Sequence, residues 1–129
     1  MFSHVMVGSN DIGRSKRFYD ALFAAIDAKP GITDDKGRLI YLHEGGIFMV
    51  SKPIDGQPAC HANGGTVGFA MDSPEQADRW HAAGVANGGT TIEEPPGIRE
   101  REFGKLYLAY LRDPDSNKLC ALHRFPRDR

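Results

Sequence analysis

Two residues near opposite ends of this chain could do chemistry, His4 and Cys120. An imidazole titrates close to neutral pH, so His4 could bind a metal, accept a proton or hold a ligand by a hydrogen bond. A thiol becomes a nucleophile when a nearby positive charge favours its thiolate, and Lys118 is the basic residue closest to Cys120 in the sequence. Either residue can also have a purely structural role. His4 would then be a strand histidine hydrogen-bonded to backbone or water, and Cys120 a small buried apolar residue.

The other potentially reactive residues have spacings that give weaker evidence for a chemical site. Cys60-His61 lies in a loop rich in Gly and Pro, where consecutive side chains point apart, so we interpret this pair as part of a linker. His43-Glu44 lies at a hairpin turn and is either solvated or next to a ligand. The alternating charges of residues 99–102 fit either a solvated loop or a mobile lid over an anionic substrate. The sequence contains no nucleophile elbow, phosphate-binding glycine loop or HExxH motif.

The elements that position Cys120 form a hairpin over residues 105–124. The apolar run 106–111 predicts a buried strand, and Asp113-Pro114-Asp115-Ser116 is typical of a turn. In the following strand, residues 118–123, alternation places Cys120 on the same face as Lys118 and Leu122. Leu119 and Ala121 take the other face.

The same order of elements occurs twice along the chain. The predicted elements are a strand at 3–7, a helix from Ile12 capped by Asn10 or Asp11, strands at 38–43 and 47–51, a strand at 66–71, a helix from Pro74 capped by Ser73, a short strand at 90–93 and the hairpin. The two helix starts lie about 63 positions apart. We therefore predict one domain, 1–129, built from a βαβββ module at 1–56 and a second at 64–125.

Length, charge and cysteine content exclude several classes of protein. The 129 residues suit one compact domain. Sixteen basic against seventeen acidic side chains give a net charge of −1, which argues against capture of nucleic acid or an anionic membrane surface. There is no apolar stretch of transmembrane length and no signal-peptide pattern. Two cysteines are too few for a disulfide framework, so we expect a cytoplasmic protein.

The repeat, the strand containing His4, the helix sequence RSKRFYDALF at 14–23 and the turn DPDSNKL at 113–119 together resemble the vicinal oxygen chelate superfamily. This superfamily contains glyoxalases, bleomycin-resistance proteins and extradiol dioxygenases. The resemblance covers essentially the whole chain. It implies an α+β fold in which two βαβββ modules form a cupped mixed sheet around a small-molecule site.

Metal-dependent members of that superfamily bind a divalent ion with His, Gln or Glu from the first and last strand of each module. The resemblance carries these four positions onto His4, Met49, Thr66 and Cys120. Met, Thr and Cys are poor ligands for a hard divalent ion. We therefore expect no metal and no other cofactor.

Two functions follow from the resemblance, and the sequence leaves both open. One is a module that binds a small organic molecule in an apolar cup, and the other is a glyoxalase-type enzyme, similar to a lactoylglutathione lyase, or a related metal-assisted enzyme. His4 and Cys120 are the candidate catalytic residues. The predicted ligand pocket consists of His4, Met6, Met49, Ser51, Thr66, Gly68, Cys120 and Leu122. The resemblance also implies a homodimer, because modules of this superfamily commonly complete their cups across two chains.

Overall fold

The computed structural model describes residues 1–126 and contains two units of helix and sheet. The first unit comprises β1 (Val5–Gly8), α1 (Ile12–Ala24), β2 (Ile32–Thr33), β3 (Leu39–His43) and β4 (Gly46–Ser51). The second comprises β5 (Val67–Ala70), α2 (Pro74–Ala86), β6 (Thr90–Thr91), β7 (Gly97–Arg101), β8 (Gly104–Arg112) and β9 (Lys118–Arg124). The predicted α+β fold of two similar units is confirmed.

Each unit folds into its own sheet with the same pairing. The strand order is β1-β4-β3-β2 in the first sheet and β5-β9-β8-β6 in the second, with β7 also paired to β8. In both sheets the first strand runs parallel to the last, and the other neighbours are antiparallel. Within the described residues, β1 and β5 are therefore edge strands, each with one side unpaired.

The helices begin where local sequence signals place them. The Asp11 carboxylate accepts a hydrogen bond from the Arg14 N–H at 3.0 Å, which caps α1. The Ser73 hydroxyl accepts from the Gln76 N–H at 3.1 Å, and Pro74 occupies the first turn of α2, where its missing N–H is harmless. Both predicted helix starts are confirmed.

One sequence prediction is wrong. The charged run 99–102, interpreted as a loop or lid, falls mostly within β7, which pairs along β8 with Arg99 opposite Leu106. An edge strand has one open side, so it tolerates charged side chains that a central strand would exclude. Alternating charge at a period of two is compatible with such a strand.

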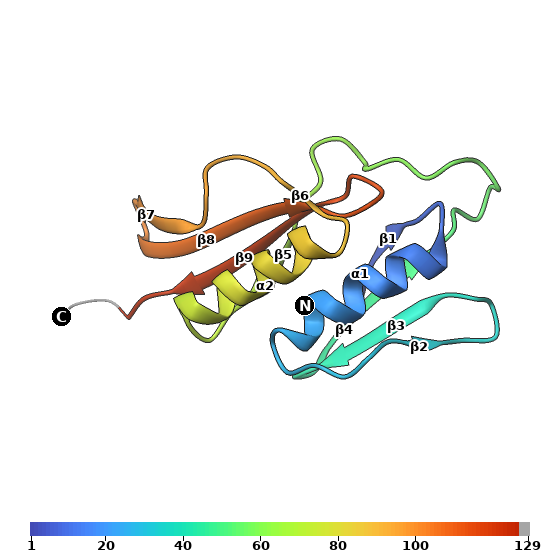
Figure 1. Ribbon diagram of the computed structural model, residues 1–129, viewed down its shortest axis with the longest axis horizontal. Helices are drawn as coiled ribbons and strands as arrows, with labels where there is room; N and C mark the ends of the chain where they lie inside the picture. The colour runs from blue at the N-terminus through green and yellow to red at the C-terminus, as the bar shows by residue number, and fades with distance from the viewer. Residues whose placement is uncertain (127–129) are drawn as a thin grey trace.

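The helices lie side by side on one side of the two sheets, and their contact faces build a single core (Figure 1). Phe18 and Trp80 are fully buried, one on each helix. Rings from both units meet in this core: Phe48 of β4 and Phe69 of β5 have centroids 5.3 Å apart in an edge-to-face arrangement. The two units therefore share one hydrophobic core.

A buried polar turn also joins the units. The turn between β8 and β9 inserts against the start of α1, where Asp115 accepts hydrogen bonds from the Asn10 N–H at 2.9 Å and from Arg14 at 2.7 Å. The Asn117 amide donates to the Gly8 carbonyl at 2.9 Å. Asp113 accepts a hydrogen bond from the Tyr19 hydroxyl at 2.5 Å. The predicted turn is thus also a contact between residues about 100 positions apart in sequence.

Candidate functional site

Side chains alternate along every strand, so each sheet has a face toward the helices and a face away from them. Val5, Phe48, Val67 and Leu119 point into the core. Their sequence neighbours Met6, Met49, Gly68 and Cys120 therefore point to the opposite side. We call this opposite side the cup face. Its members are Met6, Leu42, Ile47, Met49, Ser51, Gly68, Tyr110, Cys120 and Leu122, with His4 and Thr66 directly before β1 and β5 in the same phase.

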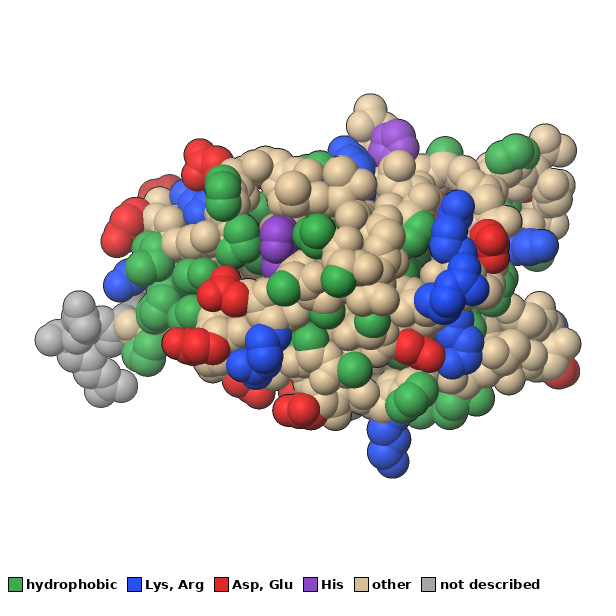
Figure 2. Space-filling view, in the orientation of Figure 1, with side chains coloured by type: hydrophobic (Ala, Val, Ile, Leu, Met, Phe, Trp, Pro, Cys, Tyr) green, Lys and Arg blue, Asp and Glu red, His purple; other side chains and the backbone are tan. Residues whose placement is uncertain are grey.

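The cup face of the first sheet is apolar and open. Met6 is 42% exposed, Leu42 is 55% exposed and Ile47 is 39% exposed, whereas Met49 between them is buried. By contrast, the face of the molecule that carries the helices shows both basic and acidic side chains (Figure 2). An exposed apolar surface of this kind marks a site where a ligand or a protein surface binds.

The two candidate catalytic residues lie in different surroundings. His4 is exposed, and its Nδ1 is 2.9 Å from the hydroxyl of Ser3. Cys120 is 6% exposed, and burial raises the pKa of its thiol above the ordinary value. Within residues 1–126, no hydrogen bond joins these two side chains. The buried thiol is therefore protonated at neutral pH.

Charged and aromatic groups surround Cys120 on the second sheet. Tyr110 is the direct neighbour of Cys120 across β8 and β9. The Lys118 ammonium lies 5.1 Å from the centre of the Tyr110 ring and forms an ion pair with Glu93. Lys118 is therefore held by Glu93 and Tyr110. Sequence analysis identified Lys118 but missed both partners, because Glu93 lies in a loop 25 positions earlier.

The side chains at the four family metal positions do not fit a divalent ion. His4 provides an imidazole, but Met49 offers a thioether, Thr66 a neutral hydroxyl, and Cys120 a buried thiol whose raised pKa disfavours the thiolate that binds metals. Among the described residues there is no cluster of three or more His, Cys, Asp or Glu side chains that could hold an ion. We therefore assign no chemical step to a metal.

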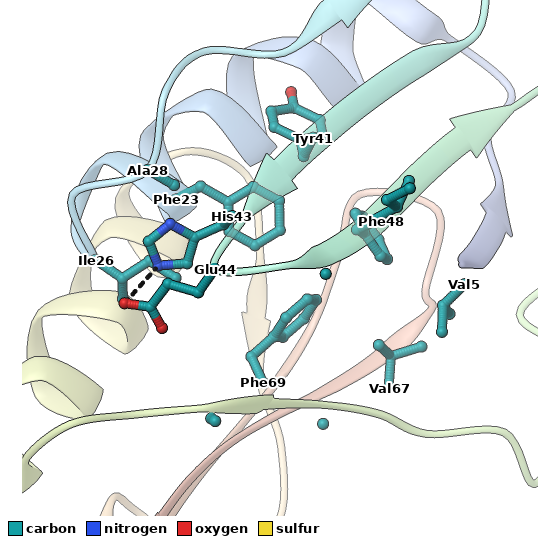
Figure 3. A pocket seen from close by; sticks show the side chains of 14 residues that line it. Val5, Phe23, Ile26, Ala28, Tyr41, His43, Glu44, Phe48, Val67 and Phe69 are labelled. Atoms are coloured by element: carbon teal, nitrogen blue, oxygen red, sulfur yellow. Dashed lines mark ion pairs between the residues drawn. The ribbon is translucent and has the colours of Figure 1, made fainter. Parts of the chain in front are cut away.

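The structure also contains a cavity that sequence analysis did not predict. It has a volume of about 270 Å³ and lies between the two units, among the end of α1, the β3–β4 hairpin and β5 (Figure 3). Its aromatic lining consists of Phe23, Tyr41, Phe48 and Phe69. We call it the seam cavity. Of the eight predicted pocket residues, Gly68 alone lines it.

None of the helices within residues 1–126 has the length and apolar composition needed to cross a bilayer.

Comparison with known proteins identifies close structural relatives. No model of a protein family and no curated protein matches the sequence. A crystal structure of a glyoxalase/bleomycin resistance protein from Albidiferax ferrireducens T118 is 61% identical in sequence, with a TM-score of 0.93, and the match covers 96% of this chain and 99% of that one.

More distant structures share the fold. A glyoxalase/bleomycin resistance protein/dioxygenase family enzyme from Burkholderia phytofirmans PsJN has a TM-score of 0.71 at 18% identity, covering 95% of this chain and 98% of that one. The fosfomycin resistance protein FosX from Mesorhizobium loti has a TM-score of 0.66 at 16% identity, covering 97% and 92%. At such identities the likeness shows the fold alone.

Proposed function

Because this chain belongs to the glyoxalase/bleomycin resistance protein family of the vicinal oxygen chelate superfamily, we propose that it binds a small organic molecule on its cup face without a metal ion. The observation that carries this proposal is the composition of the cup face. Apolar Met6, Leu42 and Ile47 are exposed there on adjacent strands. An apolar molecule binds to such a surface because contact between the two shields the apolar surface of each from water.

Few polar groups are available to orient a ligand on this face. His4 can donate or accept a hydrogen bond, and Ser51 and Thr66 each contribute a hydroxyl. The buried, protonated Cys120 contributes a small apolar contact rather than a nucleophile. This set of groups suits binding and sequestration of a ligand better than acid–base or nucleophilic catalysis.

A second copy of the chain would close the cup. The exposed apolar side chains of the first sheet lack a cover within one chain, and a homodimer that buries them would enclose the ligand.

The described cysteines are both unpaired, which favours the reducing cytoplasm as the location.

A thermal-unfolding screen against small organic molecules, with and without chelator, tests the proposal. A ligand at a hundred times its Kd should stabilise the protein by about 2.7 kcal/mol, and chelator should not change this value. Met6→Lys should weaken binding of such a ligand about tenfold or more. Val85→Lys is the matched control, because Val85 is 46% exposed but lies on α2.

Light scattering on the same variants tests the dimer, which should dissociate in Met6→Lys and persist in Val85→Lys. Equal binding by both variants would contradict a ligand site on the cup face. Chemical conversion of the bound molecule, followed by mass spectrometry, would instead favour the glyoxalase-type enzyme.

A further inference from the structure

The seam cavity lies where the two sheets meet without pairing. The unpaired edge of β5 borders it along all four residues, Val67–Ala70, and the start of β4 borders it from the first unit. β1 begins at Val5, which lies opposite Phe48 of β4. The two residues of β4 before Phe48, Gly46 and Ile47, therefore have no β1 residue beside them. Two sheet edges therefore leave a gap of about 270 Å³, near the lower end of the range for small-molecule pockets.

The walls of this gap are aromatic. Phe23 from α1 lies edge-to-face with Phe69 from β5, with centroids 5.2 Å apart, and Phe48 from β4 lies 5.3 Å from Phe69 in the same manner. Figure 3 shows Phe23, Phe48 and Phe69 around the open space. Rings in such arrangements offer both faces and edges to a further ring, so an aromatic guest fits better than a flexible aliphatic chain.

The rim of the cavity carries one exposed carboxylate. Glu44 lies at the tip of the β3–β4 hairpin, and its oxygen is 3.7 Å from His43 Nε2. The backbone of Glu44 has φ 48°, a left-handed conformation that is unusual for a residue other than Gly, Asn or Asp. Glu44 is one of the residues that line the cavity, and Figure 3 shows its carboxylate next to His43.

The charges around the cavity favour a cation over an anion. None of the described residues that line it is Lys or Arg, and the Tyr41 hydroxyl already donates to Asp20 at 2.8 Å. The His43 imidazole also lines the cavity, but its Nε2 lies 3.7 Å from the Glu44 carboxylate. An anionic group would therefore find no Lys or Arg partner and would meet Glu44 as a like charge. A protonated amine would find the Glu44 carboxylate and the faces of the surrounding rings.

We propose that the seam cavity is a second ligand site, which takes an aromatic molecule carrying a short protonated amine. The ring packs against the cluster formed by Phe23, Phe48 and Phe69, and the ammonium group contacts Glu44 at the rim. This site goes beyond the proposed function, because it lies between the units. It shares Gly68 with the predicted pocket and Ile47 with the cup face, but none of its other lining residues.

Three probes of similar shape test the charge preference by calorimetry at neutral pH: phenethylamine, 2-phenylethanol and 3-phenylpropionate. Phenethylamine should bind most tightly and 3-phenylpropionate at least tenfold more weakly. Glu44→Gln should weaken phenethylamine about fivefold and leave 2-phenylethanol unchanged. Glu94→Gln is the matched control, because Glu94 is similarly exposed and pairs with Arg99 away from the cavity.

The location is tested by filling the cavity. Ala28 lines it, and Ala28→Phe should abolish binding of phenethylamine. Amide chemical shifts of the wild-type protein give an independent test that needs no variant. Phenethylamine should move the signals of Phe48, Phe69 and Glu44 and leave those of Met6 and Leu122 in place.

Three results would overturn the proposal: no binding of phenethylamine at millimolar concentration, equal affinity for the anionic probe, or shifts confined to the cup face. None of them would affect the cup-face proposal, since Met6→Lys tests that site separately.

Discussion

The Tyr19→Phe substitution removes one hydroxyl from the polar contact between the two units. Tyr19 is fully buried and Asp113 is 3% exposed, and their hydrogen bond is 2.5 Å long. The other hydrogen bonds to the Asp113 carboxylate come from its own turn, from Asp115 and Asn117. Tyr19 is therefore the donor that the first unit contributes. Phe keeps the ring and its contacts with Phe18 and Phe23.

The expected cost follows from the charge and burial of the acceptor. A hydrogen bond to a charged group contributes about 1.5–3 kcal/mol, and loss of one donor from a buried carboxylate lies within this range. We expect the free energy of unfolding at neutral pH to fall by about 2 kcal/mol. For a domain of this length that corresponds to a decrease in Tm of roughly 7 °C.

The loss should depend on pH. Burial raises the pKa of Asp113 above its ordinary value of 3.8, and the Tyr19 hydrogen bond opposes this increase. A raised carboxyl pKa means that the folded state holds the proton more tightly than the unfolded state. This group's contribution to stability therefore decreases as pH rises above 3.8 toward the folded pKa. Tyr19→Phe raises the folded pKa further, so its cost should be largest at neutral pH and shrink on acidification.

Urea unfolding at neutral pH and at about pH 5 measures both effects. Tyr107→Phe is the matched control, because its hydroxyl donates to Asp78 at 2.6 Å on the exposed surface. It should change stability by less than about 0.5 kcal/mol. A cost for Tyr19→Phe no greater than this control, or one that grows on acidification, would refute the role assigned to the buried pair.

Three further predictions concern the core and the thiol. Trp80→Ala should destabilise the protein by about 3–5 kcal/mol, because the indole is fully buried between α2 and the second sheet, and a near-neutral Tm would contradict this. Gly89→Ala should cost about 1–3 kcal/mol in chemical unfolding, since an added Cβ would lie 2.8 Å from the Gly84 carbonyl oxygen, whereas Gly68→Ala, which meets open space, should be nearly neutral. In a Cys60→Ser background, Cys120 should resist alkylation unless denaturant is added, because the thiol is buried and its pKa is raised. Rapid labelling with an apparent pKa near 7 that rises in His4→Ala would instead support a reactive pair of His4 and Cys120.

Local signals in the sequence were enough to predict both helices and the strands at the centre of each sheet, but not β7, whose charged residues were interpreted as a loop or lid. Ser73 and Pro74 mark the start of α2 because capping depends on residues within one turn of helix. Alternation placed Leu119 and Ala121 on the face opposite Cys120 because side chains change sides at every strand residue, and in the structure that face lies in the core. The superfamily resemblance then arranged these elements into two paired units.

Contacts between distant residues were beyond such signals. The turn at 113–117 was predicted as a turn, but nothing local indicates that its carboxylates meet Tyr19 and Arg14. The seam cavity was missed for a related reason. Phe23, Phe48 and Phe69 fit the pattern of core residues, and the space beside them depends on how far apart the two sheet edges lie.

The absence of a metal requirement is the central claim of the proposed function, and metal content tests it most directly. The purified protein would be incubated with equal amounts of Mn²⁺, Fe²⁺, Ni²⁺ and Zn²⁺, separated from free ions by gel filtration and subjected to elemental analysis. With Met49, Thr66 and Cys120 beside His4, we expect no stoichiometric metal. One ion per chain that is lost in His4→Ala would contradict the account and restore a metal-assisted enzyme.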